Sequence, residues 1–98
     1  MPKFSRSQKF TKQNITKLSG SKPVVYLLTD KQGVPKYVGI AKRGRVQDRL
    51  IEHKDIKKEQ IDGATRMKIM QVQNLDKAHT KEKGLIKKLQ PEQNKLHK

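Results

Sequence analysis

Apolar residues along the chain fall into short blocks, and their spacing differs from block to block. Val24–Leu28 is a continuous apolar run with β-branched and aromatic side chains, which is typical of a buried strand. Asp30–Gly33 then supplies turn residues, and the apolar pattern resumes over Lys36–Ile40 as a second short strand. Two strands joined by so short a connection predict an antiparallel β-hairpin.

The length of the hairpin loop decides which side chains of the two strands share a face of the sheet. With two or four residues in the loop, Tyr26 pairs with Gly39 and Leu28 pairs with Tyr37, so both tyrosines lie on one face. A loop of three or five residues places the tyrosines on opposite faces. The sequence leaves both registers open.

The next predicted element is a helix over Val46–His53, which follows the basic loop Ala41–Arg45. Apolar residues in this segment recur four positions apart, which is the spacing of one face of a helix. Arg49 and His53 are also four positions apart, so we expect their side chains on a common face.

A third strand and a final helix follow. Arg66–Val72 alternates, with Met67, Ile69 and Gln71 on one side and Lys68, Met70 and Val72 on the other, which predicts a third strand. Asn74 is a good residue to cap a helix that runs to about Leu89, and Pro91 follows its end.

The first 22 residues contain six basic side chains and no acidic one. We expect disorder over Met1–Lys9 and a short helix within Phe10–Leu18, with Thr11 as its cap. Two interpretations of this segment remain open, a basic arm that holds phosphates and a solvated tail. The expected divisions of the chain are the basic arm 1–22, the domain 23–94 and the basic tail 95–98.

Composition narrows the class of protein. The 98 residues carry a formal net charge of +15, and 32% of them are hydrophobic, so we expect one domain with one small core. Such a charge makes nucleic acid the expected partner, while a merely soluble basic surface is the alternative. The chain has no cysteine, which excludes disulfides. No apolar run approaches the ~20 residues of a membrane span, so we expect no membrane partner and a cytoplasmic location, with the nucleoid if the source is bacterial.

Glu82 is the acidic residue with the least obvious structural reason for its position. It falls four residues after Ala78 and three before Leu85, so it lies on or beside the apolar face of the last predicted helix. Burying a charge is costly unless it is paired or binds a metal, which leaves a salt bridge with a lysine and a metal site as the two interpretations. Magnesium is usually held by one or two carboxylates together with water and substrate phosphates, so one carboxylate satisfies that demand.

Arg49 and His53 form a second candidate pair. The guanidinium of arginine is suited to a phosphate, and histidine can exchange a proton near neutral pH. Together they could bracket a phosphodiester, although an exposed arginine and a partly buried histidine explain the same pattern. Tyr26 and Tyr37 likewise have an alternative explanation as packed strand residues with their hydroxyls at the rim.

The ordered set of these residues resembles the GIY-YIG nuclease superfamily. The matching positions are Val24-Val25-Tyr26, Tyr37-Val38-Gly39, Arg49, His53, Glu82 and Asn94. The stretch Glu82–Asn94 is particularly similar to the N-terminal nuclease domain of the excision-repair subunit UvrC, and the resemblance covers Pro23–Asn94. It implies an α+β fold, with a small three-stranded antiparallel sheet flanked by helices.

The resemblance also implies a function, a metal-dependent endonuclease that hydrolyses phosphodiester bonds in DNA by a one-metal mechanism. One Mg²⁺ (or Mn²⁺) per site is expected on Glu82. The other implied catalytic residues, which surround the scissile phosphate, are Tyr26, Tyr37, Arg49 and His53.

Several further residues are implied at the site. Asn94 is expected to assist near the substrate, and Gly39 is expected to have a structural role. Where UvrC-like domains carry a lysine directly after the second motif, this chain has Ile40. The candidates to replace its charge, and to bind nucleic acid, are Lys42, Arg43 and Arg45. The glycine that opens the family's first motif is Val24 here, and a valine can continue the strand.

We expect a duplex or branched DNA substrate with little sequence specificity, because the chain is too short for a separate sequence-reading domain. It either acts by itself or depends on homodimerisation or a partner protein. The likeness to a repair protein points to DNA repair, while the sequence leaves a mobile-element role equally open. The alternatives are a non-catalytic nucleic-acid-binding module with this fold and a basic partner of ribosomal RNA.

Overall fold

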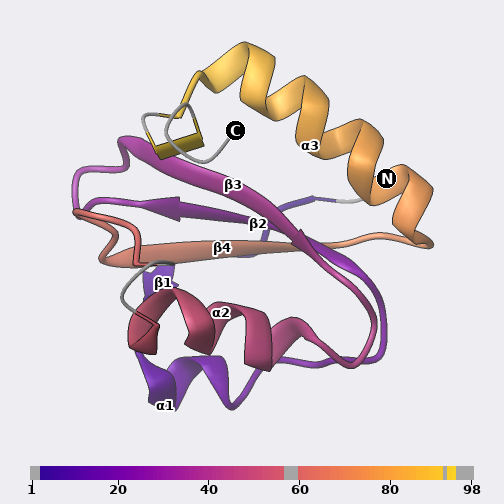
Figure 1. Cartoon of the computed structure of the whole chain (residues 1–98), viewed down its shortest axis with the longest axis horizontal. Coiled ribbons are helices and arrows are strands. Elements are labelled where there is room, and N and C mark those ends of the chain that lie inside the picture. Colours follow the sequence, from indigo (N-terminus) through magenta and orange to yellow (C-terminus); the bar gives the residue numbers. More distant parts are fainter. Residues whose placement is uncertain (1–2, 57–59, 92, 95–98) are drawn as a thin grey trace.

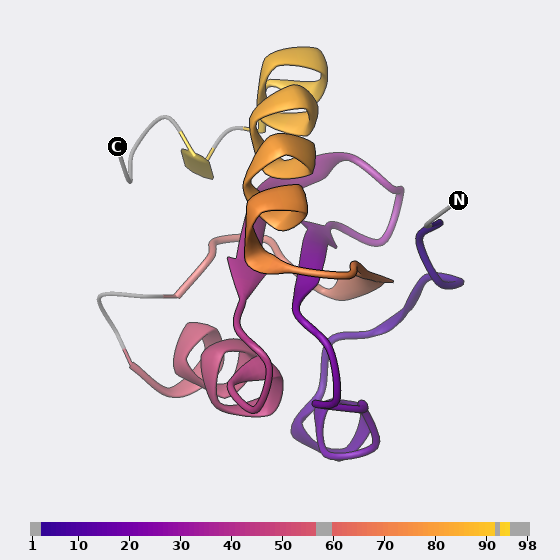
Figure 2. The same cartoon turned by 90° about the vertical axis from the view of Figure 1, so that its right-hand side faces the viewer.

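One antiparallel sheet lies between helices that cover both of its faces (Figure 1). The computed structural model describes residues 3–56, 60–91 and 93–94. The strand order is β1-β4-β2-β3, with α3 on one face and with α1 and α2 on the other, as the end-on view of Figure 2 shows. The elements in chain order are β1 (Gln8–Lys9), α1 (Lys12–Ile15), β2 (Val24–Thr29), β3 (Pro35–Ala41), α2 (Val46–Asp55), β4 (Arg66–Gln71) and α3 (Leu75–Leu89). The expected α+β class is confirmed.

The sheet has four strands rather than the expected three, because the N-terminal segment adds β1 alongside β4. Gln8 pairs with Met67 in the antiparallel ladder. Further upstream, the Ser5 N–H donates to the Ile69 carbonyl at 2.7 Å, and the Ile69 N–H donates to Ser5 Oγ at 3.0 Å. Backbone pairing therefore holds residues 3–9, where we expected disorder.

The short helix α1 holds this N-terminal segment on the face of the sheet that α1 and α2 cover. Thr11 Oγ1 accepts a hydrogen bond from the Asn14 N–H, and Ile15 is fully buried. Lys54 of α2 donates to the Phe10 carbonyl at 2.7 Å, and its ammonium lies 4.5 Å from the centre of the Phe10 ring. The basic arm thus packs on the body, and its division from the domain at residue 22 stays a prediction.

Alternation along the strands builds two core layers. Tyr26 and Leu28 of β2 point toward α1 and α2, while Val25 and Leu27 point toward α3. The first layer contains Phe10, Ile15, Val24, Tyr26, Leu28, Ala41, Val46, Leu50, Ile61, Met67 and Ile69, and the second contains Val25, Leu27, Val38, Met70, Val72 and Ala78. Because both faces are covered, β2 is apolar along its whole length, as its sequence predicted.

The hairpin register places the two tyrosines on one face in spite of a five-residue loop. Residues 30–34 connect β2 to β3, a length that would ordinarily separate the tyrosines. Pairing shifts by one residue after Leu28, however, because Thr29 pairs with Pro35 and Leu28 with Tyr37. This bulge leaves Lys36 as the extra residue and restores the register in which Tyr26 faces Gly39.

The ends of α3 agree with the sequence analysis. Asn74 Oδ1 accepts a hydrogen bond from the Lys77 N–H at 2.9 Å, which caps the first turn. At the other end Gln90 adopts a left-handed conformation with φ 47°, and its N–H donates to the Ile86 carbonyl at 2.8 Å. This is the usual way to end a helix, although glycine is the residue that most often occupies such a position.

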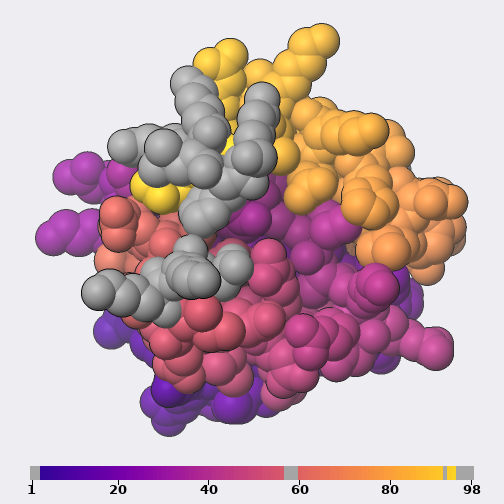
Figure 3. Space-filling view, viewed as in Figure 1, coloured from indigo at the N-terminus to yellow at the C-terminus, as the bar shows by residue number. Residues whose placement is uncertain are grey.

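The helices that carry the candidate residues approach β3 from opposite faces. In the space-filling view of Figure 3, side chains of α2 and α3 stand on either side of a band of β3. None of the helices in the described part of the chain is long and apolar enough to cross a membrane.

We predict that Gln90→Gly stabilises the protein, because glycine adopts the left-handed conformation without the steric cost that a Cβ brings. The free energy of unfolding in urea should rise by roughly 0.5–1 kcal/mol. Lys87→Gly, one turn earlier on the exposed side of α3, is the matched control and should lower it by about 1 kcal/mol. A loss of stability in Gln90→Gly would contradict the assigned backbone conformation.

Candidate active site

Tyr26 lies across Gly39, its partner in the hairpin, so closely that no side chain fits at position 39. A Cβ built on Gly39 would overlap Cζ and Oη of Tyr26 and would lie 2.8 Å from Cε1. Tyr26 is fully buried in the layer that faces α2. The expected structural role of Gly39 therefore has a steric explanation in this fold.

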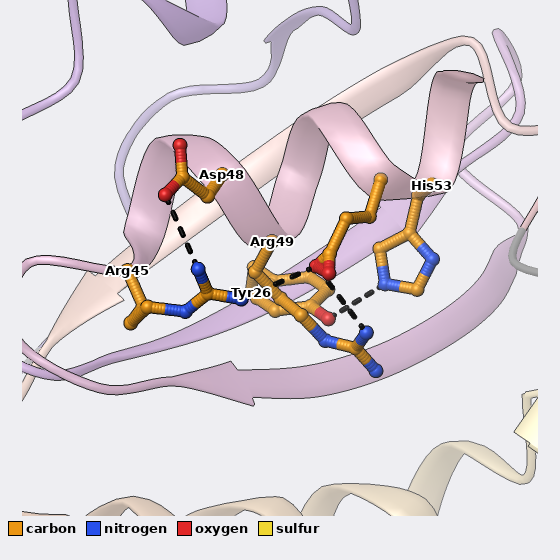
Figure 4. A network of polar contacts seen from close by, with 6 residues as sticks. Tyr26, Arg45, Asp48, Arg49 and His53 are labelled. Carbon is orange, nitrogen blue, oxygen red and sulfur yellow. Dashed lines mark hydrogen bonds and ion pairs between the residues drawn. The ribbon is translucent and has the colours of Figure 1, made fainter. Parts of the chain in front are cut away.

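The hydroxyl of Tyr26 meets the imidazole of His53, which α2 presents from its last turn (Figure 4). Tyr26 Oη and His53 Nε2 are 2.7 Å apart, and the histidine is 2% exposed. In the tautomer with a proton on Nδ1, Nε2 accepts this hydrogen bond from the tyrosine. Sequence spacing placed His53 on the Arg49 face of the helix, and contact with Tyr26 follows from the strand register.

Tyr37 completes a group of three rings on this face. Its ring centre lies 6.2 Å from that of Tyr26 and 5.0 Å from that of His53. The rings of Tyr26 and His53 are 5.6 Å apart and meet edge to face. Tyr37 is half-buried, so its side chain links the buried Tyr26–His53 pair to the solvent side of the site.

Burial dominates the electrostatics of Tyr26. Loss of solvation raises the pKa of its phenol far above the ordinary value, and Tyr37 raises it further. The positive charge of Arg49 and a hydrogen bond from its side chain act in the opposite direction, whereas Glu82 adds to the rise. The phenol is therefore protonated at neutral pH in this state, and it can donate to His53 Nε2 when the imidazole carries its proton on Nδ1.

Arg49 and Arg45 share a carboxylate that the sequence analysis did not identify. Glu52 Oε2 lies 3.6 Å from Arg45 Nη2 and 3.8 Å from Arg49 Nη1 (Figure 4). This oxygen is buried and has no hydrogen-bond partner among the described residues. Asp48, which is exposed, accepts a further hydrogen bond from Arg45 Nη1 at 3.2 Å. The two arginines are thus held next to each other on successive turns at the start of α2.

Glu82 reaches the site from α3, on the other face of the sheet. Its side chain is 22% exposed, and burial raises the pKa of its carboxyl group, against the nearby charges of His79 and Lys83. His79 Nδ1 lies 4.0 Å from Glu82 Oε1, at the limit of an ion pair. Because Glu82 also influences the pKa of Tyr26, its carboxylate lies within electrostatic range of the phenol.

The side-chain amide of Asn94 is hydrogen-bonded to the backbone of β3. Its Oδ1 accepts a hydrogen bond from the Val38 N–H at 2.7 Å, and its Nδ2 donates to the Val38 carbonyl at 2.9 Å. The side chain therefore imitates a neighbouring strand, next to Tyr37 and Gly39. A second hydrogen of its amide remains for another acceptor, so the expected role near the substrate is still a prediction.

The basic loop before α2 borders a small hollow of about 260 Å³. Its lining comprises Ile40, Ala41, Lys42, Arg45 and Arg49. Two of the three expected nucleic-acid-binding residues, Lys42 and Arg45, thus face the same space as Arg49. Arg43 is exposed and does not line it.

A divalent cation fits the carboxylate that this site provides. The described residues contain no group of three or more His, Cys, Asp or Glu side chains arranged around one point, which argues against a zinc-type cage. Glu82 offers a single half-buried carboxylate whose ionisation is disfavoured by burial, and a bound cation would offset that cost. This donor set matches magnesium, which keeps several waters and takes few protein ligands.

Comparison with known proteins gives matches among solved structures. No model of a protein family matches the chain, and no curated protein does. A crystal structure of the GIY-YIG N-terminal endonuclease domain of UvrC from Thermotoga maritima, bound to its catalytic divalent cation magnesium, is similar at 32% identity with a TM-score of 0.67. The alignment covers 84% of this chain and 97% of that one. Two point mutants of that domain with a divalent cation, one Asn to Ala and one Tyr to Phe, also match at 32% identity and a TM-score of 0.67, over 84% of this chain and 96% of theirs.

We predict that Gly39→Ala destabilises the protein, because the new methyl group overlaps the ring of Tyr26. The expected loss in the free energy of unfolding is about 1–3 kcal/mol, as for other overpacked cores. Gly84→Ala is the matched control, since a Cβ there meets no atom within 4 Å and the residue lies within α3. It should gain about 0.5–1 kcal/mol. Equal stability of Gly39→Ala and wild type would rule out the close packing of Tyr26 on Gly39.

Proposed function

Since this chain belongs to the GIY-YIG nuclease superfamily, we propose that it is a divalent-metal-dependent endonuclease that hydrolyses phosphodiester bonds in DNA. One observation supports this most directly. Tyr37, Arg49 and His53 meet around Tyr26 on one face of the sheet, and Glu82 approaches the same phenol from the other face. The likeness to a magnesium-bound endonuclease domain over most of both chains adds to it.

Arg49 is the residue proposed to hold the scissile phosphate. Its side chain is 33% exposed, so the guanidinium can meet a phosphate at the surface while its charge still acts on Tyr26. A planar, permanently charged fork suits two oxygens of one phosphate. The same charge stabilises the additional negative charge that develops on the phosphate oxygens in the transition state.

Tyr26 and His53 are proposed to move the proton of the attacking water. Because burial keeps the phenol protonated, Tyr26 cannot act as a preformed phenolate base. The 2.7 Å contact with His53 Nε2 offers another route, in which Tyr26 passes its own proton to the imidazole while it takes one from water. The resulting hydroxide forms the new bond to phosphorus as the bond to the 3′ oxygen breaks. Tyr37 would orient the water or the phosphate through its hydroxyl.

Glu82 would hold the cation. When bound, a divalent cation supplies Lewis-acid polarisation of the phosphate and charge stabilisation for the leaving oxygen. One cation per site is proposed, and Mg²⁺ or Mn²⁺ both accept oxygen ligands of this kind. Glu52 is not available in the same way, because its carboxylate is taken up by two arginines.

The proposed substrate is duplex or branched DNA recognised mainly through its backbone. Lys42 and Arg45 line the hollow beside Arg49, Arg43 is exposed in the same loop, and the whole chain carries a net charge of +15. Such contacts position the protein on phosphates and carry no sequence information by themselves. Asn94 is proposed to contribute through its remaining amide hydrogen.

We predict that the protein nicks supercoiled plasmid in Mg²⁺ and that Glu82→Ala lowers the rate at least 100-fold, the order of loss typical for a key catalytic electrostatic group. EDTA should abolish nicking in the wild type. Asp76→Asn, an exposed carboxylate in the first turn of the same helix, should retain activity close to that of the wild type. Metal-dependent nicking that survives Glu82→Ala would overturn the metal assignment. Salt-sensitive DNA binding without any cleavage would instead support a binding module.

The raised pKa of Glu82 gives a prediction that does not depend on activity. The carboxyl has a higher pKa in the folded than in the unfolded state, so its ionisation opposes folding and this cost appears as the pH rises through and above the ordinary carboxyl range. In EDTA at pH 7, Glu82→Gln should therefore melt at or above the wild-type temperature, and the difference should vanish toward pH 4. Thermal unfolding measured by circular dichroism checks this.

Saturating Mg²⁺ should reverse the order at pH 7. A ligand at 10–100 times its Kd stabilises by roughly 1.4–2.7 kcal/mol, which raises the melting temperature of a domain of this size by several degrees. The wild type should show this increase and Glu82→Gln should not. An equal increase in both proteins would mean that the cation binds elsewhere.

A further inference from the structure

Glu52 is a half-buried charged group at the site to which the proposed hydrolysis gives no role. Its side chain is 27% exposed, but Oε2 is buried and lacks a hydrogen-bond partner among the described residues. Leaving a carboxylate oxygen in this state is costly unless neighbouring charges compensate it. The compensating charges are the guanidinium groups of Arg45 and Arg49, at 3.6 and 3.8 Å.

The position of this carboxylate has a direct effect on the two arginines. Arg45 and Arg49 are four residues apart at the start of α2, so their side chains leave the helix about 5–6 Å from each other. The two guanidinium groups lie 3.6 and 3.8 Å from one carboxylate oxygen, so they are close enough to repel each other, and this shared carboxylate offsets the repulsion. Figure 4 shows both guanidinium groups drawn toward the same carboxylate beside Tyr26. Glu52 thereby adds a shared contact to two side chains that also have separate partners, Asp48 for Arg45 and Tyr26 for Arg49.

The hollow of about 260 Å³ lies where the paired arginines are exposed. Lys42 contributes a third cation to its lining and makes no ion pair with any described residue. Against the carboxylates of Glu52 and Asp48, the three cations leave a net positive charge at the hollow. It is smaller than the pockets of roughly 300–1,000 Å³ that hold whole small molecules, so a single phosphate group is the anion that suits it.

We infer that this hollow binds a second phosphate of the DNA strand, next to the one on Arg49, and that Glu52 is a positioning residue that holds Arg45 and Arg49 side by side to grip both. Neighbouring phosphates of one strand follow each other at about 3.4 Å of helix axis, so two guanidinium groups held close together can contact both. Arg49 then serves the cleaved phosphate while Arg45 and Lys42 hold its neighbour. This inference rests on the proposed DNA substrate, yet the phosphate contact itself does not require cleavage.

The first experiment measures equilibrium binding to a short DNA duplex over a range of salt concentrations in EDTA. Each phosphate contact contributes about 0.9 to the slope of log K against log salt concentration. Arg45→Ala should lower the slope by about 1, and Lys87→Ala, which removes an exposed cation from α3, should leave it unchanged. In a Glu52→Gln background, Arg45→Ala should lower the slope by less than half as much, because Arg45 is no longer held at the phosphate. An unchanged slope in Arg45→Ala overturns the phosphate site, and full additivity with Glu52→Gln overturns the positioning role.

The second experiment measures cleavage of duplexes in which one methylphosphonate replaces a phosphate next to the mapped cut. Wild type should cleave one such duplex at least tenfold more slowly than the unmodified DNA. Arg45→Ala should cleave the two duplexes at rates within about twofold of each other, because this variant has already lost the contact that the methylphosphonate removes. Glu52→Gln should also reduce this discrimination, whereas a purely structural residue would slow both reactions equally. Discrimination in Arg45→Ala as large as in wild type overturns the inference.

The two experiments separate failure of the inference from failure of the proposed nuclease activity. A reduced salt slope without any cleavage keeps the phosphate site and removes the catalytic proposal. Cleavage with a salt slope that Arg45→Ala leaves unchanged keeps the catalytic proposal and removes the phosphate site. Glu52→Gln is isosteric and Arg45 is half-exposed, so both variants should fold, which circular dichroism verifies.

Discussion

The close approach of the Tyr26 ring to the backbone of Gly39 determines the geometry of the whole site. Because no Cβ stands at position 39, the ring can lie flat across the neighbouring strand and direct its hydroxyl toward α2. That contact exists only in the register that pairs the two residues, and the register depends on the extra residue at Lys36. A bulge at the end of a hairpin thus decides whether a buried phenol can reach an imidazole.

The site lies at the margin of the sheet, where helices from both faces come within reach of one strand. The groups proposed to move protons and hold phosphate come from β2, β3 and α2, whereas the candidate metal ligand comes from α3. The groups of the site differ in how far they are exposed to solvent. Tyr26 and His53 are shielded from water, but Arg49 and Glu82 are only partly so, which allows a charged substrate to approach them. The arrangement keeps Tyr26 and His53, the proposed proton-transfer pair, away from water while Arg49 and Glu82 remain accessible.

Much of this structure could be predicted from the sequence, and what was missed has physical reasons. Helix ends carry local signals, so Asn74 and Pro91 delimited α3 correctly. Helical periodicity predicted that Glu82 lies on or beside the apolar face of α3. The hairpin register was open, because the turn chemistry of Asp30–Gly33 does not reveal a bulge. Strand β1 was missed, since two polar residues that pair through backbone groups leave no hydrophobic pattern.

Glu52 and the contacts of Asn94 could not be read from the sequence for a related reason. A glutamate among lysines and arginines on a helix looks like part of an ordinary solvated face. Only the fold shows that its oxygen is buried between two guanidinium groups. The double hydrogen bond of Asn94 to Val38 joins residues 56 positions apart, and periodicity carries no information at that range.

That double hydrogen bond also bears on how the molecule behaves in a crowded solution. An outermost strand normally offers unpaired N–H and C=O groups on which another chain can assemble, the first step of sheet-mediated aggregation. Asn94 occupies those groups of Val38 in the middle of β3. On the opposite side, two-residue β1 is too short to template another strand, and Ser5 occupies further groups of β4. Asn94 and the short β1 therefore interrupt the two borders of the sheet, so an added strand would find no continuous ladder of free backbone groups around Val38.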